Sequence, residues 1–374
     1  MRMGSITIAV PLLAISIGVS PLILGILGSA PGLAYISLCF LFGKLSERWH
    51  RKNLVILGSS VYMAASLILC LSSQIYQLYL SMVLLGIAGA MFWPALETWI
   101  AEKQSKRPLV QKMALFNFSW SAGLTMGPLL GGVLFEVNLK LPFYFALIIS
   151  AFIFFILFWK TPKVNLSTKN KDSTHKAVFL ENPPDNFSLY IKISRIANFT
   201  LWLSLGIIRY IFPKLGTELA ISPSFLGLLM FALCLSQTLT FYGLGIIHQW
   251  HYRIFPLILF QLIAVVGLVV VFTTGSLPLF FLAFVFIGVG IGMTHSSSLF
   301  YSVNITSQRG PSAAIHETVL GTGGLLGPLI GGAVAQKFSL RAPYLVVAAV
   351  VVVGILIQIL IKRYYGFLNR ANTG

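Results

Sequence analysis

Ionisable side chains inside long apolar runs are the first candidates for chemistry in this sequence. The runs contain Arg209, Glu97, His295, His316 and Glu317. A charged side chain at the centre of a membrane costs roughly 2.5–3.5 kcal/mol even on lenient insertion scales, so such residues are usually kept for function. Each of these residues is therefore a candidate for binding a solute or carrying a proton.

Arg209 is the deepest of these residues, about 13 positions into its run and hence roughly 20 Å along a helix. A fixed guanidinium can hold a carboxylate or phosphate of a solute through charge-assisted hydrogen bonds. It can also pair with an acid of the protein, or reach the outer interface beside Tyr210 and Lys214. We favour the solute contact, and the other two roles stay open.

Glu97 and Trp93 lie one turn apart on the same helix face, near the end of another run. A carboxyl group shielded from water suits a proton carrier, because burial disfavours its charged form. An interfacial acid that pairs with Lys103 fits the sequence equally well. Trp93, Trp120 and Trp202 could form apolar walls of a site or simply fill the core.

Two histidines add polar groups to later runs. His295 is followed by three serines and could bind solute or shuttle a proton, although a structural role in the core is equally compatible. His316 and Glu317 open the next run, where Glu317 also suits a helix N-terminus. Glu97, Asn117, His295, His316 and Glu317 together predict an inner proton or gate network beneath an outer solute site at Arg209.

Membrane helices must position these residues. Hydrophobic residues make up 57% of the chain and charged residues only 9%, whereas soluble domains carry about 25% charged residues. The apolar runs of roughly 20 residues can each cross a hydrocarbon core of about 30 Å. They lack the alternation of a barrel strand, so we predict an all-α fold. The twelve predicted spans are approximately 4–18, 21–42, 54–72, 77–100, 112–135, 141–160, 196–216, 221–246, 254–275, 278–301, 312–336 and 342–361.

The Lys and Arg residues that give the net charge of +17 are distributed unevenly across the predicted membrane segments. If the N-terminus is inside, the inner segments hold 21 of the 26 Lys and Arg residues, Arg2 among them. The exceptions are Lys140, Lys214, Lys337 and Arg341 outside, and Arg209 within a span. The positive-inside rule then predicts a multi-pass protein of the plasma (inner) membrane with both termini in the cytoplasm, and no nucleic-acid partner.

A repeat divides the chain into two halves. We predict an N-terminal six-helix bundle at 1–160, a polar cytoplasmic linker at 161–195, and a C-terminal six-helix bundle with a short tail at 196–374. The strongest match lies 200 positions apart and joins Gly123, Gly127, Pro128, Gly131 and Gly132 to Gly323, Gly327, Pro328, Gly331 and Gly332. Equal orientation of the halves predicts a two-fold axis along the membrane normal.

A second offset, of 202 positions, aligns the early helices. It matches Pro11, Gly25 and Gly86 with Pro213, Gly227 and Gly288. The first span then has fewer residues before its proline than the seventh. We expect a natural start upstream of this sequence, and a naturally short first helix is the alternative.

These features resemble the major facilitator superfamily over the whole chain. The loop from Gly43 to Lys52 is similar to the family's G-x-L-x-D-R-x-G-R-R/K signature, with Glu47 for Asp and His50 for the second Gly. The resemblance implies a gating latch made by Gly43, Glu47, Arg48, Arg51 and Lys52. The bases could also serve only the positive-inside rule. The matching loop from Gly245 to Arg253 keeps Trp250 and His251 but has no acid.

The doubled glycine stripe resembles the antiporter signature of drug exporters in this superfamily. Glycines spaced by four share one helix face and allow close packing, and Pro128 permits a bend. The resemblance implies efflux, while tight packing alone would say nothing of direction. The Arg that proton-coupled exporters usually carry in span four is replaced by Met82, with Leu85 instead of Gln before Gly86. The coupling ion is therefore open.

We expect a monomeric secondary transporter that exports a small amphipathic or anionic solute in exchange for a proton or another cation. A facilitator or importer of a metabolite is the alternative, and a non-transporting receptor or scaffold is a more distant one. No nucleotide-binding loop or metal-ligand spacing is visible, and Cys39, Cys70 and Cys234 fall inside spans. We therefore expect no enzyme activity, cofactor or metal.

Overall fold

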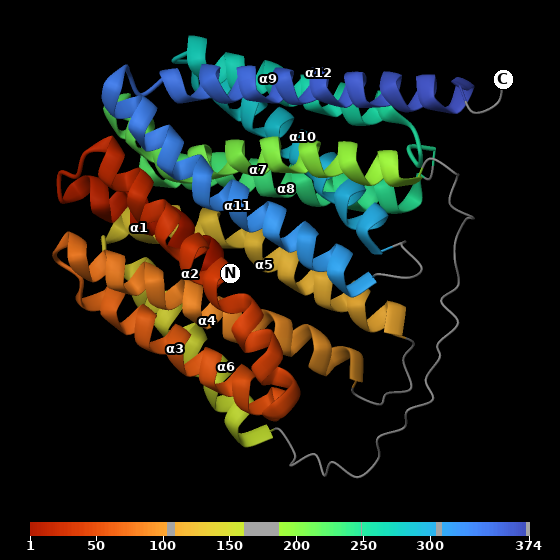
Figure 1. Cartoon of the computed structure of the whole chain (residues 1–374). Coiled ribbons are helices and arrows are strands. Elements are labelled where there is room, and N and C mark those ends of the chain that lie inside the picture. Colours follow the sequence, from red (N-terminus) through yellow and green to blue (C-terminus); the bar gives the residue numbers. More distant parts are fainter. Residues whose placement is uncertain (103–108, 161–186, 248, 304–308, 372–374) are drawn as a thin grey trace.

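The computed structural model describes residues 1–102, 109–160, 187–247, 249–303 and 309–371. Within these ranges the chain forms helices and no strand (Figure 1), which confirms the predicted all-α fold. The helices are α1 (Arg2–Ser16), α2 (Pro21–Arg48), α3 (Arg51–Leu71), α4 (Ile75–Glu102), α5 (Leu109–Val137), α6 (Leu141–Lys160), α7 (Phe187–Glu218), α8 (Pro223–Ile246), α9 (Ile254–Thr273), α10 (Leu277–Val303), α11 (Arg309–Lys337) and α12 (Ala342–Ala371).

The helices α1 and α7 differ most in length. The 15 residues of α1 begin midway along the bundle, whereas the 32 residues of α7 run along its length (Figure 1). A short first helix agrees with the sequence, but α7 begins at Phe187, well before the predicted start at 196. Ten described helices are long and apolar enough to cross a membrane, and α1 is a shorter apolar helix.

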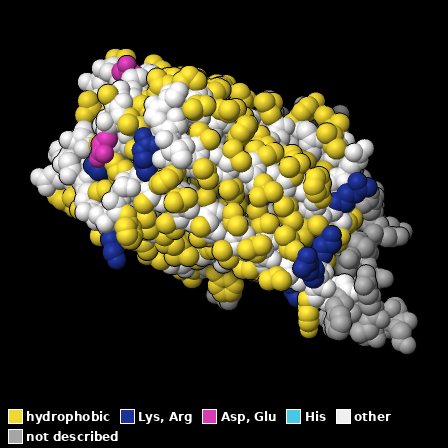
Figure 2. All heavy atoms as spheres, turned by 90° about the horizontal axis from the view of Figure 1, so that it is seen from above, with side chains coloured by type: hydrophobic (Ala, Val, Ile, Leu, Met, Phe, Trp, Pro, Cys, Tyr) yellow, Lys and Arg dark blue, Asp and Glu magenta, His cyan; other side chains and the backbone are white. Residues whose placement is uncertain are grey.

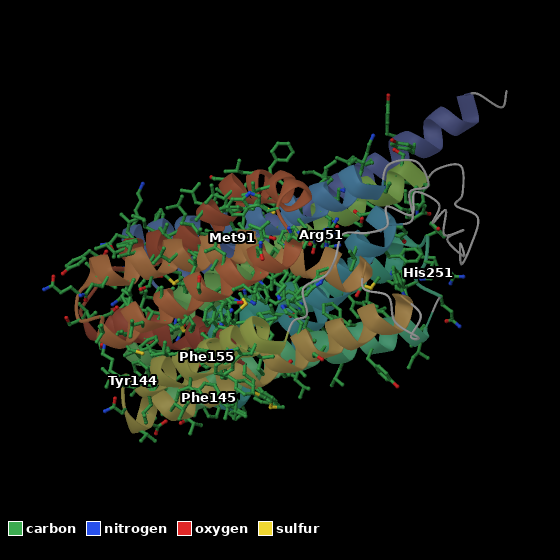
Figure 3. All side chains as sticks on the ribbon, turned by 90° about the horizontal axis from the view of Figure 1, so that it is seen from below. Arg51, Met91, Tyr144, Phe145, Phe155 and His251 are labelled. Atoms are coloured by element: carbon green, nitrogen blue, oxygen red, sulfur yellow. The ribbon has the colours of Figure 1, made fainter. Side chains whose placement is uncertain are left out.

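Two ends of the bundle can be distinguished. At the linker end, α6 finishes at Lys160 and α7 begins at Phe187; the far end carries the short loops 17–20, 72–74, 138–140, 219–222, 274–276 and 338–341. Hydrophobic side chains cover the middle of the molecule, and charged side chains gather towards the two ends (Figure 2). Tyr144 and His251 lie towards opposite ends (Figure 3). This belt matches the surface expected in a bilayer.

Equivalent caps begin two equivalent helices. Ser20 and Ser222 each accept a hydrogen bond from a backbone N–H in the first turn of α2 and α8, and a proline follows each serine. Ser at the N-cap and Pro at the first helical position satisfy or remove the free N–H groups of a helix start. The 202-residue offset therefore has a structural counterpart.

Two far-end cations cap the ends of helices. The Lys140 ammonium donates to the carbonyl oxygen of Ser72, which follows α3. Arg341 donates to the carbonyl oxygens of Phe272, at 2.9 Å, and Thr274, at the end of α9. Cations bind the free carbonyls of helix C-termini favourably. These bonds give two of the four cations predicted on the outer side a structural role at that end.

The glycine stripe packs within each half at equivalent points. A Cβ at Gly4 would lie 2.6 Å from Pro128 of α5, and a Cβ at Gly206 would lie 2.6 Å from Pro328 of α11. In both halves a helix backbone therefore passes directly over the proline of the stripe. Only glycine allows such an approach.

The same stripe also joins the halves to each other. A Cβ at Gly132 in α5 would lie 2.4 Å from the carbonyl oxygen of Pro223 in α8, and one at Gly332 in α11 would lie 2.6 Å from that of Pro21 in α2. Hydrogen bonds cross the same two seams. Ser29 donates to the carbonyl oxygen of Leu325 at 2.6 Å, and the Ser121 and Thr238 hydroxyls lie 2.7 Å apart.

Candidate functional site

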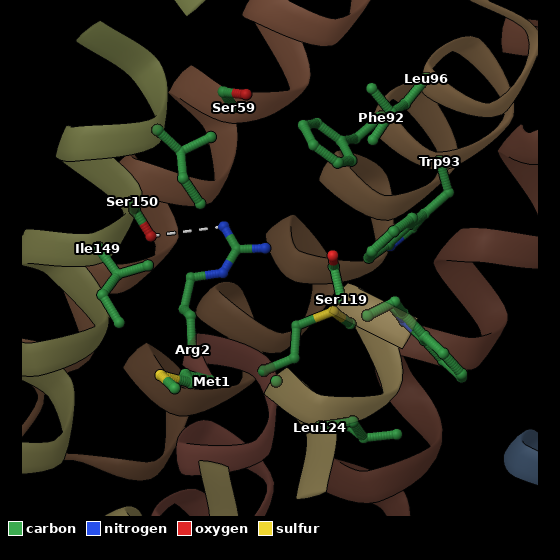
Figure 4. A pocket seen from close by; sticks show the side chains of 14 residues that line it. Met1, Arg2, Ser59, Phe92, Trp93, Leu96, Ser119, Leu124, Ile149 and Ser150 are labelled. Atoms are coloured by element: carbon green, nitrogen blue, oxygen red, sulfur yellow. Dashed lines mark hydrogen bonds between the residues drawn. The ribbon is translucent and has the colours of Figure 1, made fainter. Parts of the chain in front are cut away.

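A cavity of about 280 Å³ lies inside the first six helices (Figure 4). Residues of α1, α3, α4, α5 and α6 line it. Its walls are mainly apolar and aromatic, with Phe92, Trp93 and Trp120 among them. Phe92 and Trp93 meet edge to face with ring centroids 5.3 Å apart. Pockets of this type, largely apolar with a few polar groups, usually accept small molecules.

Arg2 provides the cationic group of this cavity. Its guanidinium lies 3.6 Å from the centroid of the Tyr62 ring and donates to the Ser150 hydroxyl at 3.4 Å. Only 9% of the residue is exposed, and no carboxylate contacts it in the described part of the chain. Arg2 was counted among the cations of the inner segments, and the structure places it in the interior of the first half instead of at the surface. The repeat held a signal, since Arg2 aligns with Ser204, well inside α7.

The predicted residues around Glu97 are only partly visible. Trp93 lines the cavity, as an apolar wall would. The backbones of Glu97 and Asn117 belong to α4 and α5, but their side chains lie outside the described residues. Their proposed part in a proton or gate network stays a prediction.

A second polar group, here called the histidine cluster, joins Trp202 of α7, His295 and Ser298 of α10, and His316 of α11. The two imidazole centroids are 5.1 Å apart, and Nδ1 of His316 lies 2.8 Å from the Ser298 hydroxyl. The Trp202 ring lies 5.9 Å from His295. His316 is 1% exposed. The structure thus brings together the two predicted histidines, whereas Glu317 turns to an exposed position.

Arg209 lies apart from both groups. It sits on α7 beside Tyr210 and close enough to Cys234 of α8 to act on it electrostatically. Its buried Nε has no hydrogen-bond partner, and no acid pairs with it among the residues that the structure describes. The internal ion pair is therefore not seen there, while solute contact stays a prediction.

The predicted gating loop is described only at its end. The side chains of Gly43, Glu47 and Arg48 lie outside the described residues, and Arg51 and Lys52 are half-buried at the start of α3. The latch therefore stays a prediction. In the second half, Trp250 donates to the Leu244 carbonyl oxygen at 3.1 Å, and His251 stacks on Phe300 at 4.2 Å. Aromatic packing therefore holds this second-half loop, which has no acid equivalent to Glu47.

Twelve helices in the described part of the chain, equivalent contacts in two halves and a solute-sized pocket are the architecture of a membrane transporter. The chain belongs to the Major Facilitator Superfamily, whose sequence pattern matches residues 1–193 and 195–369.

Individual relatives are distant. The Quinolone resistance protein NorA of Staphylococcus aureus is 22% identical over 99% of this chain and 95% of its own length. A bacterial homologue of the human lysosomal transporter Spinster, solved inward-facing and unoccupied, shares 16% identity and a TM-score of 0.77 over 97% of this chain and 93% of that one. The nucleoside transporter NupG shares 14% identity and a TM-score of 0.72 over 97% and 96%. The solved structures show the fold alone.

Proposed function

We propose that this transporter exports a small amphipathic or anionic solute in exchange for a cation. The observation that carries the proposal is the cavity, where aromatic and apolar walls surround the buried guanidinium of Arg2. Such walls suit an apolar body, and a cation without a carboxylate partner among the described residues suits an anionic group. The chain-long similarity to a quinolone resistance protein and the doubled glycine stripe support export.

The charge distribution supports a plasma-membrane location with the linker end in the cytoplasm. Exposed cations at the linker end include Lys192, Arg253, Lys362 and Arg363. At the far end, by contrast, Lys140 and Arg341 bind carbonyl oxygens of the protein. The positive-inside rule then favours cytoplasmic termini. A monomer suffices for this proposal, since α1, α3, α4, α5 and α6 of a single chain line the cavity.

Arg2 is the proposed contact for the anionic group of the solute in the cavity, and Arg209, which lies apart from the cavity, is a second candidate contact. Norfloxacin, a quinolone with a carboxylate, is a suitable probe in proteoliposomes. We expect Arg2→Gln and Arg209→Ala to reduce norfloxacin transport at least tenfold without loss of folded protein. Lys192→Ala is the matched control, because it removes an exposed cation that bonds only to Tyr365 in the described region. Unchanged transport in both arginine variants would refute these roles.

A facilitator is the second candidate, and Met82 favours it. This buried residue of α4 stands where proton-coupled exporters of the superfamily usually carry an arginine. A facilitator would move norfloxacin only down its own gradient. Collapse of the pH gradient during transport separates the two functions, since it would stop an antiporter and leave a facilitator unaffected.

A further inference from the structure

The histidine cluster contains several buried polar atoms that have no hydrogen-bond partner among the described residues. They are Nδ1 of His295, Nε2 of His316 and Nε1 of Trp202, and one turn earlier on α7 both amide atoms of Asn198 also lack a partner. A buried polar group left without a hydrogen bond costs about 1–3 kcal/mol. Several such groups in one place indicate that their bonds go to water or to a transported species.

The two imidazoles are the groups in this cluster that can gain and lose a proton. With ring centroids 5.1 Å apart, two imidazolium ions would repel each other strongly. The rings are therefore a coupled pair, in which uptake of one proton opposes uptake of a second. When Nδ1–H of His316 donates to Ser298, the lone pair of Nε2 is free to take a proton from water and later return it.

Charged groups of two helices lie near the pair. From α7, the positive charge of Arg195 acts against a charged His316, and from α11, Glu317 follows His316 in the chain. The neighbour from α8 is the uncharged Phe241, 5.3 Å from His295. The nearby helices α9 and α12 contribute Gln261 and Gln358, which bond to each other. No described carboxylate is paired with either imidazole.

The cluster also lies on helices that contact the other half. Its helix α11 packs against α2, and α7 packs against α1. Movement of the halves therefore changes the packing around the cluster and its access to water. Because burial disfavours a charged imidazole, water access determines whether the pair holds a proton.

We propose that His295 and His316 together bind one proton, and that this proton is the cation exchanged for the solute. Only the second statement, that this proton is exchanged for the solute, rests on the proposed export function. Proton binding by the pair is a property of the protein itself, so it can be tested without any solute.

The first experiment measures proton binding by NMR. The full chain carries ¹³C-labelled histidine in lipid nanodiscs, and His295→Gln and His316→Gln assign the two signals. We expect the pair to take up one proton in total as the pH is lowered from 8, with each variant shifting the titration of the remaining ring. His251→Gln, in the aromatic cluster, should leave the pair unchanged. Two static signals, or two independent protons, would overturn the proposal.

The second experiment connects the proton to transport. In proteoliposomes, His295→Gln and His316→Gln should still exchange norfloxacin when the pH is equal on both sides. Their accumulation of norfloxacin driven by a pH gradient should be at least tenfold lower than that of the wild type. Variants that still concentrate norfloxacin against its gradient would show that another group carries the proton. Wild-type protein that moves no norfloxacin in either assay would contradict the proposed export, while the NMR titration would still decide proton binding.

Discussion

Single glycines determine how closely the two halves approach each other. Replacing Gly132 by Ala would place a Cβ 2.4 Å from the Pro223 carbonyl oxygen, a backbone atom of the other half. Overpacking of this kind typically costs 1–3 kcal/mol, so we expect about that loss of stability for Gly132→Ala. The measurement is the thermal unfolding midpoint in detergent, together with the exposure of the α5–α8 seam to a cysteine reagent.

Gly324→Ala is the matched control for this substitution. It lies in the repeated stripe of α11, but nothing stands within 4 Å of its added Cβ. Alanine is favoured over glycine in a helix by about 1 kcal/mol, so this variant should be neutral or slightly more stable. Equal unfolding midpoints for the two variants would show that the close approach at Gly132 has no energetic role.

The cation of the cavity could not be found from local sequence. Arg2 owes its surroundings to Tyr62 of α3 and Ser150 of α6, which are distant in the chain. The histidine cluster was more accessible to prediction, because His295 and His316 stand out as polar groups in apolar runs. Their separation, and the bond from His316 to Ser298, depend on how α10 packs on α11.

At the scale of helices, apolar runs predicted the elements well and their ends less well. The second and eighth spans were predicted from 21 and 221, and α2 and α8 begin at Pro21 and Pro223, each directly after a capping serine. The start of α7 was predicted too late. Its first turns carry Lys192 and Arg195, which end an apolar run without ending the helix, since Leu189, Ile191 and Ile193 still pack inwards.

The start of α8 also makes a contact with α5 of the other half. Glu136, at the end of α5, accepts a hydrogen bond from the Ser224 N–H of α8 at 2.9 Å. Hydrogen bonds from Ser224, and then from Ser222, hold the pKa of Glu136 below its usual range. A lowered carboxyl pKa means that the contact is fully present above the ordinary carboxyl pKa and is lost as pH falls through the lowered value. Gln336 occupies the equivalent place in α11 and does not titrate.

We expect acid on the far side to loosen this α5–α8 contact, and Glu136→Gln to remove that pH dependence. Spin labels at Val137 and Leu219, in a background without the native cysteines, would report the distance between the halves above the ordinary carboxyl pKa and below the lowered pKa of Glu136. Glu218→Gln is the control, because it removes a charge at the same end from an exposed residue. A distance that responds equally to pH in wild type and Glu136→Gln would contradict the assignment.

For the whole molecule, the repeat places equivalent contacts within and between the halves. The prolines of the stripe meet Gly4 and Gly206 inside each half, while Gly132 and Gly332 meet the opposite half. The same two helices, α5 and α11, therefore join each half internally and to its neighbour. Relative movement of the halves must break the α2–α11 and α5–α8 seams while the internal contacts persist, which is how rocking transporters expose a site to alternate sides.

A disulfide across one seam should therefore stop transport. The Ser121 and Thr238 hydroxyls are 2.7 Å apart on α5 and α8, so the double variant Ser121→Cys with Thr238→Cys is positioned to form a bridge. Oxidation should abolish norfloxacin transport in proteoliposomes, because the halves can no longer separate there, and reduction should restore it. Each single variant, treated identically, controls for loss of the hydroxyl. Full transport by the oxidised double variant, with the bridge verified by mass spectrometry, would show that this seam stays closed throughout the cycle.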